Sequence, residues 1–186
     1  VKAKLPHARG IADRFHVVKQ LNENITKLRR TTQRKSDKKV NEILKGSRWL
    51  LVKNRQNLSP KEEIHLQKVL GICPEIREAY LLKEEFRNIF EKIKNVEQAK
   101  RFLAVWILKA QKTGSRYLAK FVRTLQNWWE EILRYFEEGI TNAFSEGINR
   151  AIRSIINRAY GYRNFDNFRL QGLAQHGYAH SHHANS

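Results

Sequence analysis

Residues 115–136 read SRYLAKFVRTLQNWWEEILRYF, and apolar side chains recur in this stretch every three or four positions. That spacing places them on one face of an α-helix, so the stretch predicts a long amphipathic helix that packs against other helices. Helix start and stop signals punctuate the chain before it. Ser59 is followed by Pro60 and, three positions after Ser59, by Glu62, which is the pattern of a capping box. Asn95 begins another helical run and Gly114 ends it. The middle of the chain is therefore expected to be helical.

Two short apolar segments interrupt the helical pattern near the start of the chain. We interpret residues 8–13 as a brief strand and residues 48–53 as a second one. Between them, apolar residues at helical spacing predict a single helix from about His16 to Lys45. A last helix is expected to begin near Ser145. These elements together predict a mostly α fold with a few short strands, an α+β class.

The chain is strongly basic, and the excess is concentrated near its start. Its 186 residues carry a formal net charge of +18, and residues 1–60 hold 16 basic and 4 acidic side chains. A polyanionic partner, most simply nucleic acid, suits this excess. A dense basic run lies at the far end of the first predicted helix. Such a run is ordinarily a solvated helix face. The charge excess of the first 60 residues favours the alternative interpretation, contact with DNA phosphates. The run consists of Arg29, Arg30, Arg34, Lys35, Lys38 and Lys39.

Other features of the composition narrow the class of protein. Cys73 is the only cysteine, which excludes an internal disulfide and fits a reducing compartment. No apolar run approaches the roughly 20 residues that a membrane-spanning helix needs, so no membrane partner is expected. The chain contains no methionine, not even at position 1, and we interpret it as a fragment.

Two acidic residues far apart in the sequence are candidates for metal-dependent chemistry. Asp13 closes a short apolar segment, and Glu146 shares the polar face of the last predicted helix with Asn149 and Arg153. Carboxylate oxygens are the ligands that Mg²⁺ prefers, and phosphoryl transfer uses such ions. Each residue also has a purely structural interpretation. Asp13 can cap a helix, and Glu146 can complement a helix dipole.

Four separated segments carry a resemblance to a known family. They read LPHA at 5–8, ADRFHVVKQLN at 12–22, KGSRWLLVKN at 45–54 and TNAFSEGINRAIRSIINRAYGYRNFDNFR at 141–169. In this order they resemble the C-terminal part of the catalytic domain of DDE transposases of the ISL-three family of bacterial insertion sequences. The resemblance extends over about residues 5–170.

The resemblance implies a fold and a division of the chain. It implies an RNase H-like core, incomplete in these residues, with an all-helical insertion. Residues 1–56 would then be a partial core and residues 57–139 the helical insertion. Residues 140–172 would be the C-terminal core helices that carry the catalytic Glu, and residues 173–186 a flexible tail rich in histidine.

The resemblance also implies a catalytic site. Asp13 would be the second carboxylate of the Asp-Asp-Glu triad and Glu146 the third, and both would be catalytic metal ligands. The cofactor would be Mg²⁺ or Mn²⁺, with two ions in the complete site. The first triad Asp is expected upstream of residue 1, so this chain alone is expected to be unable to cleave or join DNA. Further DNA contacts are assigned to Arg14, Asn149, Arg153, Arg158 and Arg163.

The implied partners are the DNA of insertion-sequence ends and target, and a second copy of the chain in a synaptic complex. The implied location is the bacterial cytoplasm, at the nucleoid. Two alternatives stay open: a non-enzymatic, basic DNA-binding protein derived from a transposase, and a gene remnant without function. Two local interpretations also stay open. Trp106, Trp128 and Trp129 serve either the core or base stacking. The histidines of the tail either lie in a disordered segment or bind zinc adventitiously.

Overall fold

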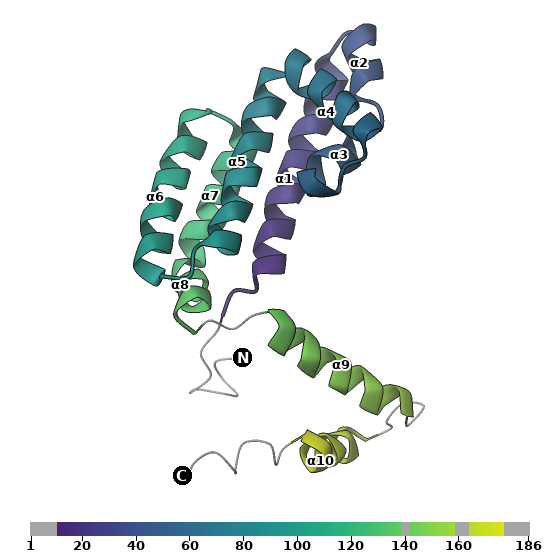
Figure 1. Cartoon of the computed structure of the whole chain (residues 1–186), viewed down its shortest axis with the longest axis vertical. Helices are drawn as coiled ribbons and strands as arrows, with labels where there is room; N and C mark the ends of the chain where they lie inside the picture. The colour runs from purple at the N-terminus through teal and green to yellow at the C-terminus, as the bar shows by residue number, and fades with distance from the viewer. Residues whose placement is uncertain (1–10, 139–141, 159–163, 177–186) are drawn as a thin grey trace. The chain divides into compact units, whose positions relative to one another are not determined.

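A computed structural model of the chain describes residues 11–138, 142–158 and 164–176 (Figure 1). The chain divides into two compact units, Val1–Gly139 and Ile140–Ser186, and each is considered by itself. The helices of the first unit are α1 (Arg14–Lys35), α2 (Lys38–Leu44), α3 (Arg48–Val52), a 3₁₀ turn η1 (Arg55–Asn57), α4 (Pro60–Ile72), α5 (Pro74–Lys92), α6 (Val96–Lys112), α7 (Arg116–Asn127) and α8 (Trp129–Glu138). The second unit contains α9 (Asn142–Arg158) and α10 (Phe165–His176).

The predicted α+β class is wrong for the residues that the structure describes, because these contain helices and no strand. The RNase H-like core implied by the resemblance is likewise not seen in them, and the fold is mostly α. The predicted strand over 48–53 is the helix α3. Leu50 and Leu51 are buried in the core on this helix. A run of six residues is too short for its apolar pattern to separate a strand from a buried helix.

The other predicted strand, over residues 8–13, is described only from residue 11 onward. Ile11 and Ala12 lie outside any helix, and the backbone N–H of Ala12 donates to the carbonyl of Glu131 in α8 at 3.0 Å. The side chain of Ala12 is buried in the core. This backbone hydrogen bond attaches residues 11–12 to α8. The segment forms no sheet with the residues that the structure describes.

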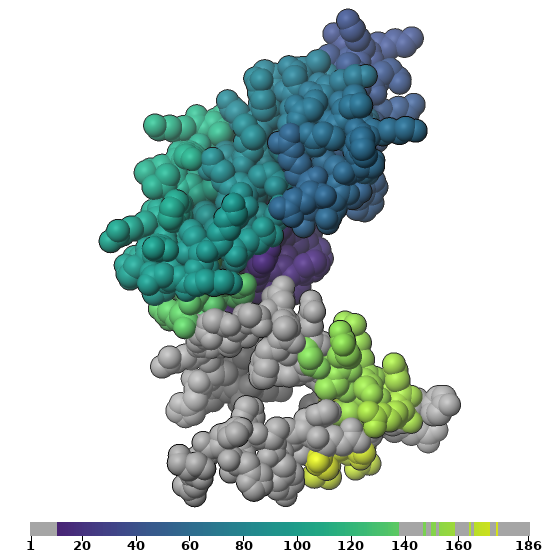
Figure 2. Space-filling model, viewed as in Figure 1, coloured from purple at the N-terminus to yellow at the C-terminus, as the bar shows by residue number. Residues whose placement is uncertain are grey.

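The core of the first unit lies between four long helices. α1 packs against α5 and α7, and α6 packs against the same two helices, so the four close a bundle (Figure 1). α2, α3 and α4 pack together beside α1, and α8 contacts α6 and α7. Figure 2 shows these helices as one packed body. An aromatic cluster packs in the middle of the bundle. The ring centroid of Phe86 lies 5.0 Å from that of Trp106 and 5.3 Å from that of Phe121.

Capping side chains begin several of the described helices, and some of these caps were readable in the sequence. The predicted capping box at Ser59 is confirmed, with bonds in both directions between Ser59 and Glu62. Asn95 caps α6 by accepting from the backbone of Gln98, and Gly114 ends the turn before α7 with φ of 65°. The single helix predicted from His16 to Lys45 is wrong. It breaks after α1, where the side chain of Asp37 accepts from the N–H of Val40 and starts α2.

The long helix predicted over residues 115–136 is also divided. Trp128, between α7 and α8, leaves the helical conformation with φ of −109° and ψ of 20°. Trp128 is partly exposed, whereas Trp129 packs against the core and Trp106 is fully buried. Trp106 also donates from its indole N–H to the carbonyl of Leu82 at 2.8 Å, so its polar atom is satisfied in the core.

The second unit consists of two helices that pack against each other. The predicted start of α9 near Ser145 is wrong, because the helix already begins at Asn142. α10 starts after Asn164, whose side chain accepts from the backbone of Asp166, and continues to His176. The first residues of the predicted tail are therefore helical, and residues 177–186 lie outside the described residues. No helix of the described residues is both long and apolar enough to cross a membrane.

Candidate functional site

Asp13 caps the first helix of the bundle. Its Oδ1 accepts from the backbone N–H of Phe15 at 2.9 Å, and its Oδ2 lies 3.9 Å from Nε2 of His16. The structural interpretation of Asp13 as a helix N-cap is confirmed. The side chain is 40% exposed, and only one of its oxygens accepts a hydrogen bond from the described residues. The other oxygen fits a metal ligand, because capping and binding a cation use different oxygens of the same carboxylate.

The backbone around Asp13 is held firmly. Ala12 is tied to α8 by its backbone bond, and the carbonyl of Asp13 accepts from the N–H of Val17 at 3.1 Å in the first turn of α1. Val17 is buried against the bundle. The carboxylate is thus fixed at one end of a rigid helix, which is how a scaffold orients a site residue.

Arg14, a predicted DNA contact, is bonded within the protein. Its guanidinium donates to Oε1 of Glu91 in α5 at 2.8 Å, and the same oxygen lies 3.2 Å from Nε of Arg87. The side chain of Arg14 is about three-quarters covered. A phosphate would have to compete with Glu91 for it. The DNA contact of Arg14 stays a prediction.

Glu146 lies in the second turn of α9, and the structure describes its backbone but not its side chain. Asn149 is described in the same way. Arg153 is exposed on this helix, and Arg158 is exposed and donates to the hydroxyl of Ser154 at 2.9 Å. Arg163 lies outside the described residues.

The two candidate metal ligands belong to different units, Asp13 to the first and Glu146 to the second, and the structure describes each within its own unit. Nowhere in residues 11–138, 142–158 and 164–176 do three or more His, Cys, Asp or Glu side chains gather as a metal site. Their joint role as metal ligands stays a prediction.

The predicted basic run divides into one structural arginine and several free cations. Arg29 donates to the carbonyl of Leu44 at 3.1 Å and so joins α1 to the end of α2. Burial, together with the charges of Arg30 and Arg48, lowers the pKa of Arg29. The exposed members of the run are Arg30, Arg34, Lys35, Lys38 and Lys39.

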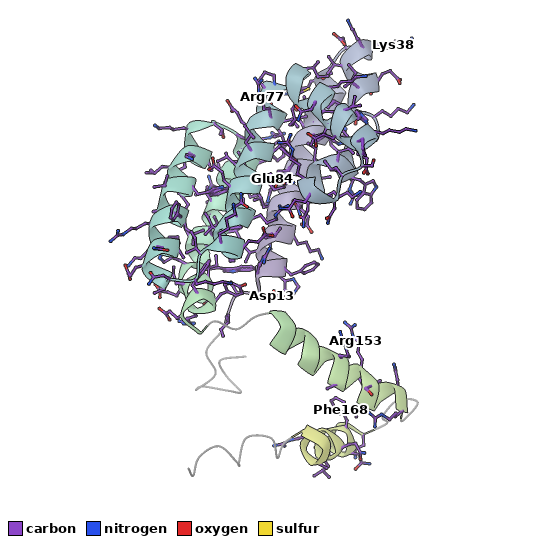
Figure 3. All side chains as sticks on the ribbon, viewed as in Figure 1. Asp13, Lys38, Arg77, Glu84, Arg153 and Phe168 are labelled. Carbon is purple, nitrogen blue, oxygen red and sulfur yellow. The ribbon has the colours of Figure 1, made fainter. Side chains whose placement is uncertain are left out.

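The exposed run and Asp13 lie at opposite ends of α1. Figure 3 labels Asp13 at one end of the first unit and Lys38 at the other. At 1.5 Å per residue, the 21 positions from Asp13 to Arg34 correspond to about 31 Å along the helix.

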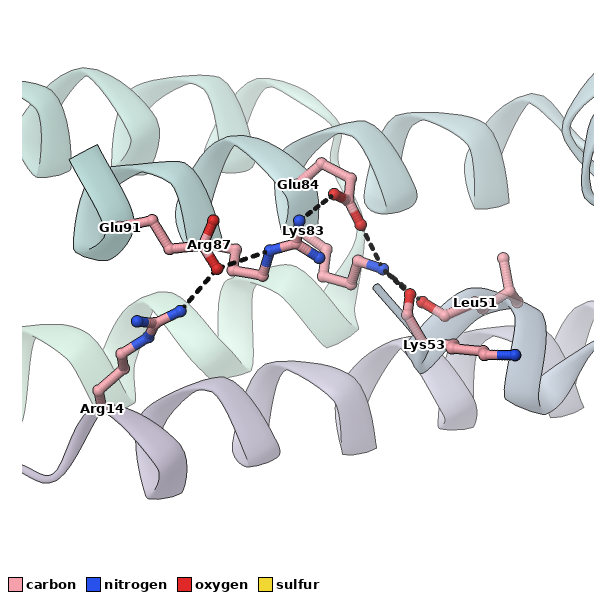
Figure 4. Close-up of polar contacts among 7 residues, drawn as sticks. All are labelled: Arg14, Leu51, Lys53, Lys83, Glu84, Arg87 and Glu91. Carbon is pink, nitrogen blue, oxygen red and sulfur yellow. Dashed lines mark hydrogen bonds and ion pairs between the residues drawn. The ribbon is translucent and has the colours of Figure 1, made fainter. Parts of the chain in front are cut away.

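A buried ionic cluster in α5 was missed by the sequence analysis (Figure 4). Nζ of Lys83 donates to the carbonyls of Leu51 and Lys53 at 2.9 and 3.2 Å, and lies 2.7 Å from Oε1 of Glu84. The other carboxylate oxygen of Glu84 lies 3.3 Å from Arg87. Lys83 thus caps the C-terminal carbonyls of α3 with a charged group. Its role is to fix α3 against the bundle.

The electrostatics of this cluster follow from its burial. The side chain of Lys83 is 3% exposed, and burial lowers its pKa while the neighbouring Glu84 opposes that shift. Burial raises the pKa of Tyr80 to about 12, and the Tyr80 ring lies 4.2 Å from Nζ of Lys83. The sequence does contain a signal for the cluster. Lys83 and Arg87 occupy positions in the apolar stripe of α5, where an ordinary solvated charge is not expected.

Comparison with known proteins identifies the family. The profile of the ISL-three family of DDE transposases, described as "Transposase", matches residues 1–171. The transposase for insertion sequence element IS1001 of Bordetella parapertussis is 28% identical over 174 residues, which are 92% of this chain and 43% of that protein. The transposase for insertion sequence element IS1557 of Mycobacterium tuberculosis is 38% identical over 69 residues, 37% of this chain and 15% of that protein.

This chain thus spans less than half the length of the Bordetella relative. No solved structure matches it significantly. The family match includes the segments around Asp13 and Glu146 and almost all of the described helices. The chain belongs to the ISL-three family of DDE transposases.

Proposed function

We propose that these residues are the part of a DNA transposase that supplies two metal-binding carboxylates, Asp13 and Glu146, and a basic helical surface for DNA. The observation that carries the proposal is the family match over residues 1–171, a range that includes both acidic residues. Divalent metal use is general in DDE transposases. Ions bound by the carboxylates would supply the charge that stabilises the attacking and leaving oxygens of an in-line displacement.

The geometry of Asp13 supports its share of this role. The carboxylate is part-exposed, its backbone is fixed at the start of α1, and Oδ2 accepts no hydrogen bond from the described residues. Glu146 would contribute from α9, where its neighbours Arg150 and Arg153 are exposed at helical spacing. These arginines would hold the phosphates of a strand beside Glu146.

We further propose that a polypeptide of these 186 residues does not cut DNA by itself, because the triad chemistry needs a third carboxylate. The test incubates the chain with supercoiled plasmid and Mg²⁺ or Mn²⁺ and follows nicking on a gel. No nicking is expected. Nicking by the unaltered chain that disappears in both Asp13→Ala and Glu146→Ala would contradict the proposal, because it would show a complete site.

The exposed basic run at the far end of α1 would hold duplex DNA through phosphate contacts. Each phosphate neutralised by a lysine or arginine contributes about 0.9 to the slope of log affinity against log salt concentration. The combined variant Arg34→Gln, Lys38→Gln and Lys39→Gln should therefore flatten the slope for duplex DNA by roughly 2 to 3. These three side chains are exposed and bonded to no acidic group among the described residues.

A matched control keeps the total charge change the same. It replaces Lys61, Lys68 and Lys100, which are exposed on α4 and α6, by glutamine. The control should change the slope less than the basic-run variant does. Equal slopes for the two variants would show that only the net charge matters and would contradict a defined DNA surface on α1. Salt-dependent DNA binding without metal binding by Asp13 would instead favour the non-enzymatic DNA-binding alternative.

A further inference from the structure

A groove lies between α1 and α3 in the first unit, on a side of α1 that the proposed basic run uses only at Arg30. Its volume is about 420 Å³. The residues of α1 that line it recur every three or four positions from Phe15 to Arg30, so they form one continuous stripe. Over 15 positions this stripe is about 22 Å long. Arg48 and Val52 of α3 form the opposite wall.

The groove is positively charged. The charged side chains that line it are four basic ones and a single acidic one, Glu23. The four basic side chains are exposed, and none forms an ion pair with a residue that the structure describes. They are Lys19, Lys27, Arg30 and Arg48. A row of exposed cations along a groove, without ion pairs to the described residues, favours a chain of phosphates.

Two large aromatic side chains stand exposed here, one lining the groove and one next to a residue that lines it. Phe15, at the start of the stripe, lines the groove and is 62% exposed. Trp49 does not line the groove itself, but it follows Arg48 on α3 and is 64% exposed. The guanidinium of Arg48 lies 4.8 Å from the centroid of the Trp49 ring. Phe and Trp are usually buried to a large extent, so two exposed rings beside a basic groove indicate a ligand with flat faces of its own.

Phosphates and flat rings together define one ligand, a DNA strand whose bases are unpaired. Proteins that bind such strands combine a basic groove with aromatic side chains on which bases stack. A duplex offers phosphates but keeps its bases stacked on one another. The 22 Å stripe accommodates about six nucleotides at the stacked spacing of about 3.4 Å. Phe15 also links the groove to the candidate metal ligand, since its backbone N–H donates to Asp13.

We infer that the groove between α1 and α3 binds an unpaired DNA strand and leads it toward Asp13. Lys19, Lys27 and Arg30 hold its phosphates along α1. Trp49 provides the stacking platform for one base, with Arg48 beside it. This inference rests on the proposed function, because it takes the polyanion to be DNA. It adds a second DNA site with a different preference, for single strands, to the duplex surface at the far end of α1.

The test measures the affinity of the whole chain for a fluorescein-labelled 12-nucleotide oligo(dT) and for a 12-base-pair duplex, by polarisation. Loss of one base–aromatic stack corresponds to roughly a 5- to 150-fold weaker affinity. Trp49→Ala should therefore weaken oligo(dT) binding by at least about fivefold and leave duplex binding nearly unchanged, and Trp49→Phe should retain most of the affinity. Because Trp49 is exposed, these variants should keep the circular dichroism of the unaltered chain.

The matched control is Phe102→Ala, because this aromatic side chain lies on α6, lines a different hollow together with residues of α5, and is 55% exposed. It should leave oligo(dT) affinity unchanged. A second variant, Lys27→Gln, should flatten the salt dependence of oligo(dT) binding by about 0.7, as expected for one phosphate contact on a single strand. Unchanged oligo(dT) affinity in Trp49→Ala, or an equal loss in Phe102→Ala, overturns the inference. If duplex binding by the basic run persists in that case, the proposed function stands without it.

Discussion

Replacing Lys83 by Met should destabilise the first unit by about 3 kcal/mol. The substitution matches the length and apolar character of the lysine stem but removes the ammonium group, which donates to two carbonyls at the end of α3 and forms an ion pair with Glu84. Removal of one partner of a buried ion pair typically costs about 3–5 kcal/mol, because the remaining charge is left without compensation. Glu84 is 18% exposed and therefore partly hydrated, which favours the lower end of that range.

Urea unfolding followed by circular dichroism measures this cost. The double variant Lys83→Met with Glu84→Gln should lose less than the two single variants together, with a coupling energy of about 1–2 kcal/mol. Lys109→Met is the matched control, because Lys109 pairs with Glu85 at 3.0 Å but both side chains are about half exposed. That control should cost at most about 1 kcal/mol. A cost for Lys83→Met within the error of the Lys109 control would refute the role assigned to the buried cluster.

Two further predictions concern helix ends. The backbone N–H of Ser59 and the ammonium group of Lys53 lower the pKa of Glu62 to about 2. The stability that Glu62 contributes is therefore present above its ordinary pKa of 4.5 and is lost as the pH falls toward 2. Thermal midpoints measured between pH 2 and 7 should fall less steeply in Glu62→Gln than in the unaltered chain, and equal steepness would contradict this. Gly114 has φ of 65°, and nothing lies within 4 Å of where a Cβ would stand. Gly114→Ala should therefore lower the free energy of unfolding by about 1 kcal/mol through backbone strain alone. Gly71→Ala is the control and should not lower it, because Gly71 lies inside α4 with the same open space and no positive φ.

Some of the fold was readable in the sequence because local chemistry decides it. Ser59 and Asn95 carry side-chain acceptors immediately before helical runs, and both cap helices as expected. Residues 48–53 were misread, since six residues contain too little periodicity to distinguish a strand from a helix. The break at Asp37 was missed because basic residues on both sides of it continue a plausible helical surface.

The candidate site was readable only in part, for physical reasons. Asp13 could be named from its motif, but its capping bond to Phe15 depends on where α1 begins. Lys83 was missed because a lysine in an amphipathic helix is ordinarily solvated, and its bonds to the carbonyls at the end of α3 form only in the folded chain. The groove between α1 and α3 depends on residues 15–30 and 48–52, which are distant in sequence and meet only in the folded chain.

The most direct test of the central claim measures whether Asp13 and Glu146 bind the same divalent ion. Mn²⁺ binding by the whole chain is followed by electron paramagnetic resonance for the unaltered chain, Asp13→Asn, Glu146→Gln and the double variant. Asn preserves the helix cap at position 13, so the substitution removes charge rather than structure. Both single variants should weaken Mn²⁺ binding, and the double variant should weaken it little further, since one lost ligand already disables a shared site. Mn²⁺ affinity that is unchanged in either single variant, or effects that add independently, would contradict a site shared by the two carboxylates.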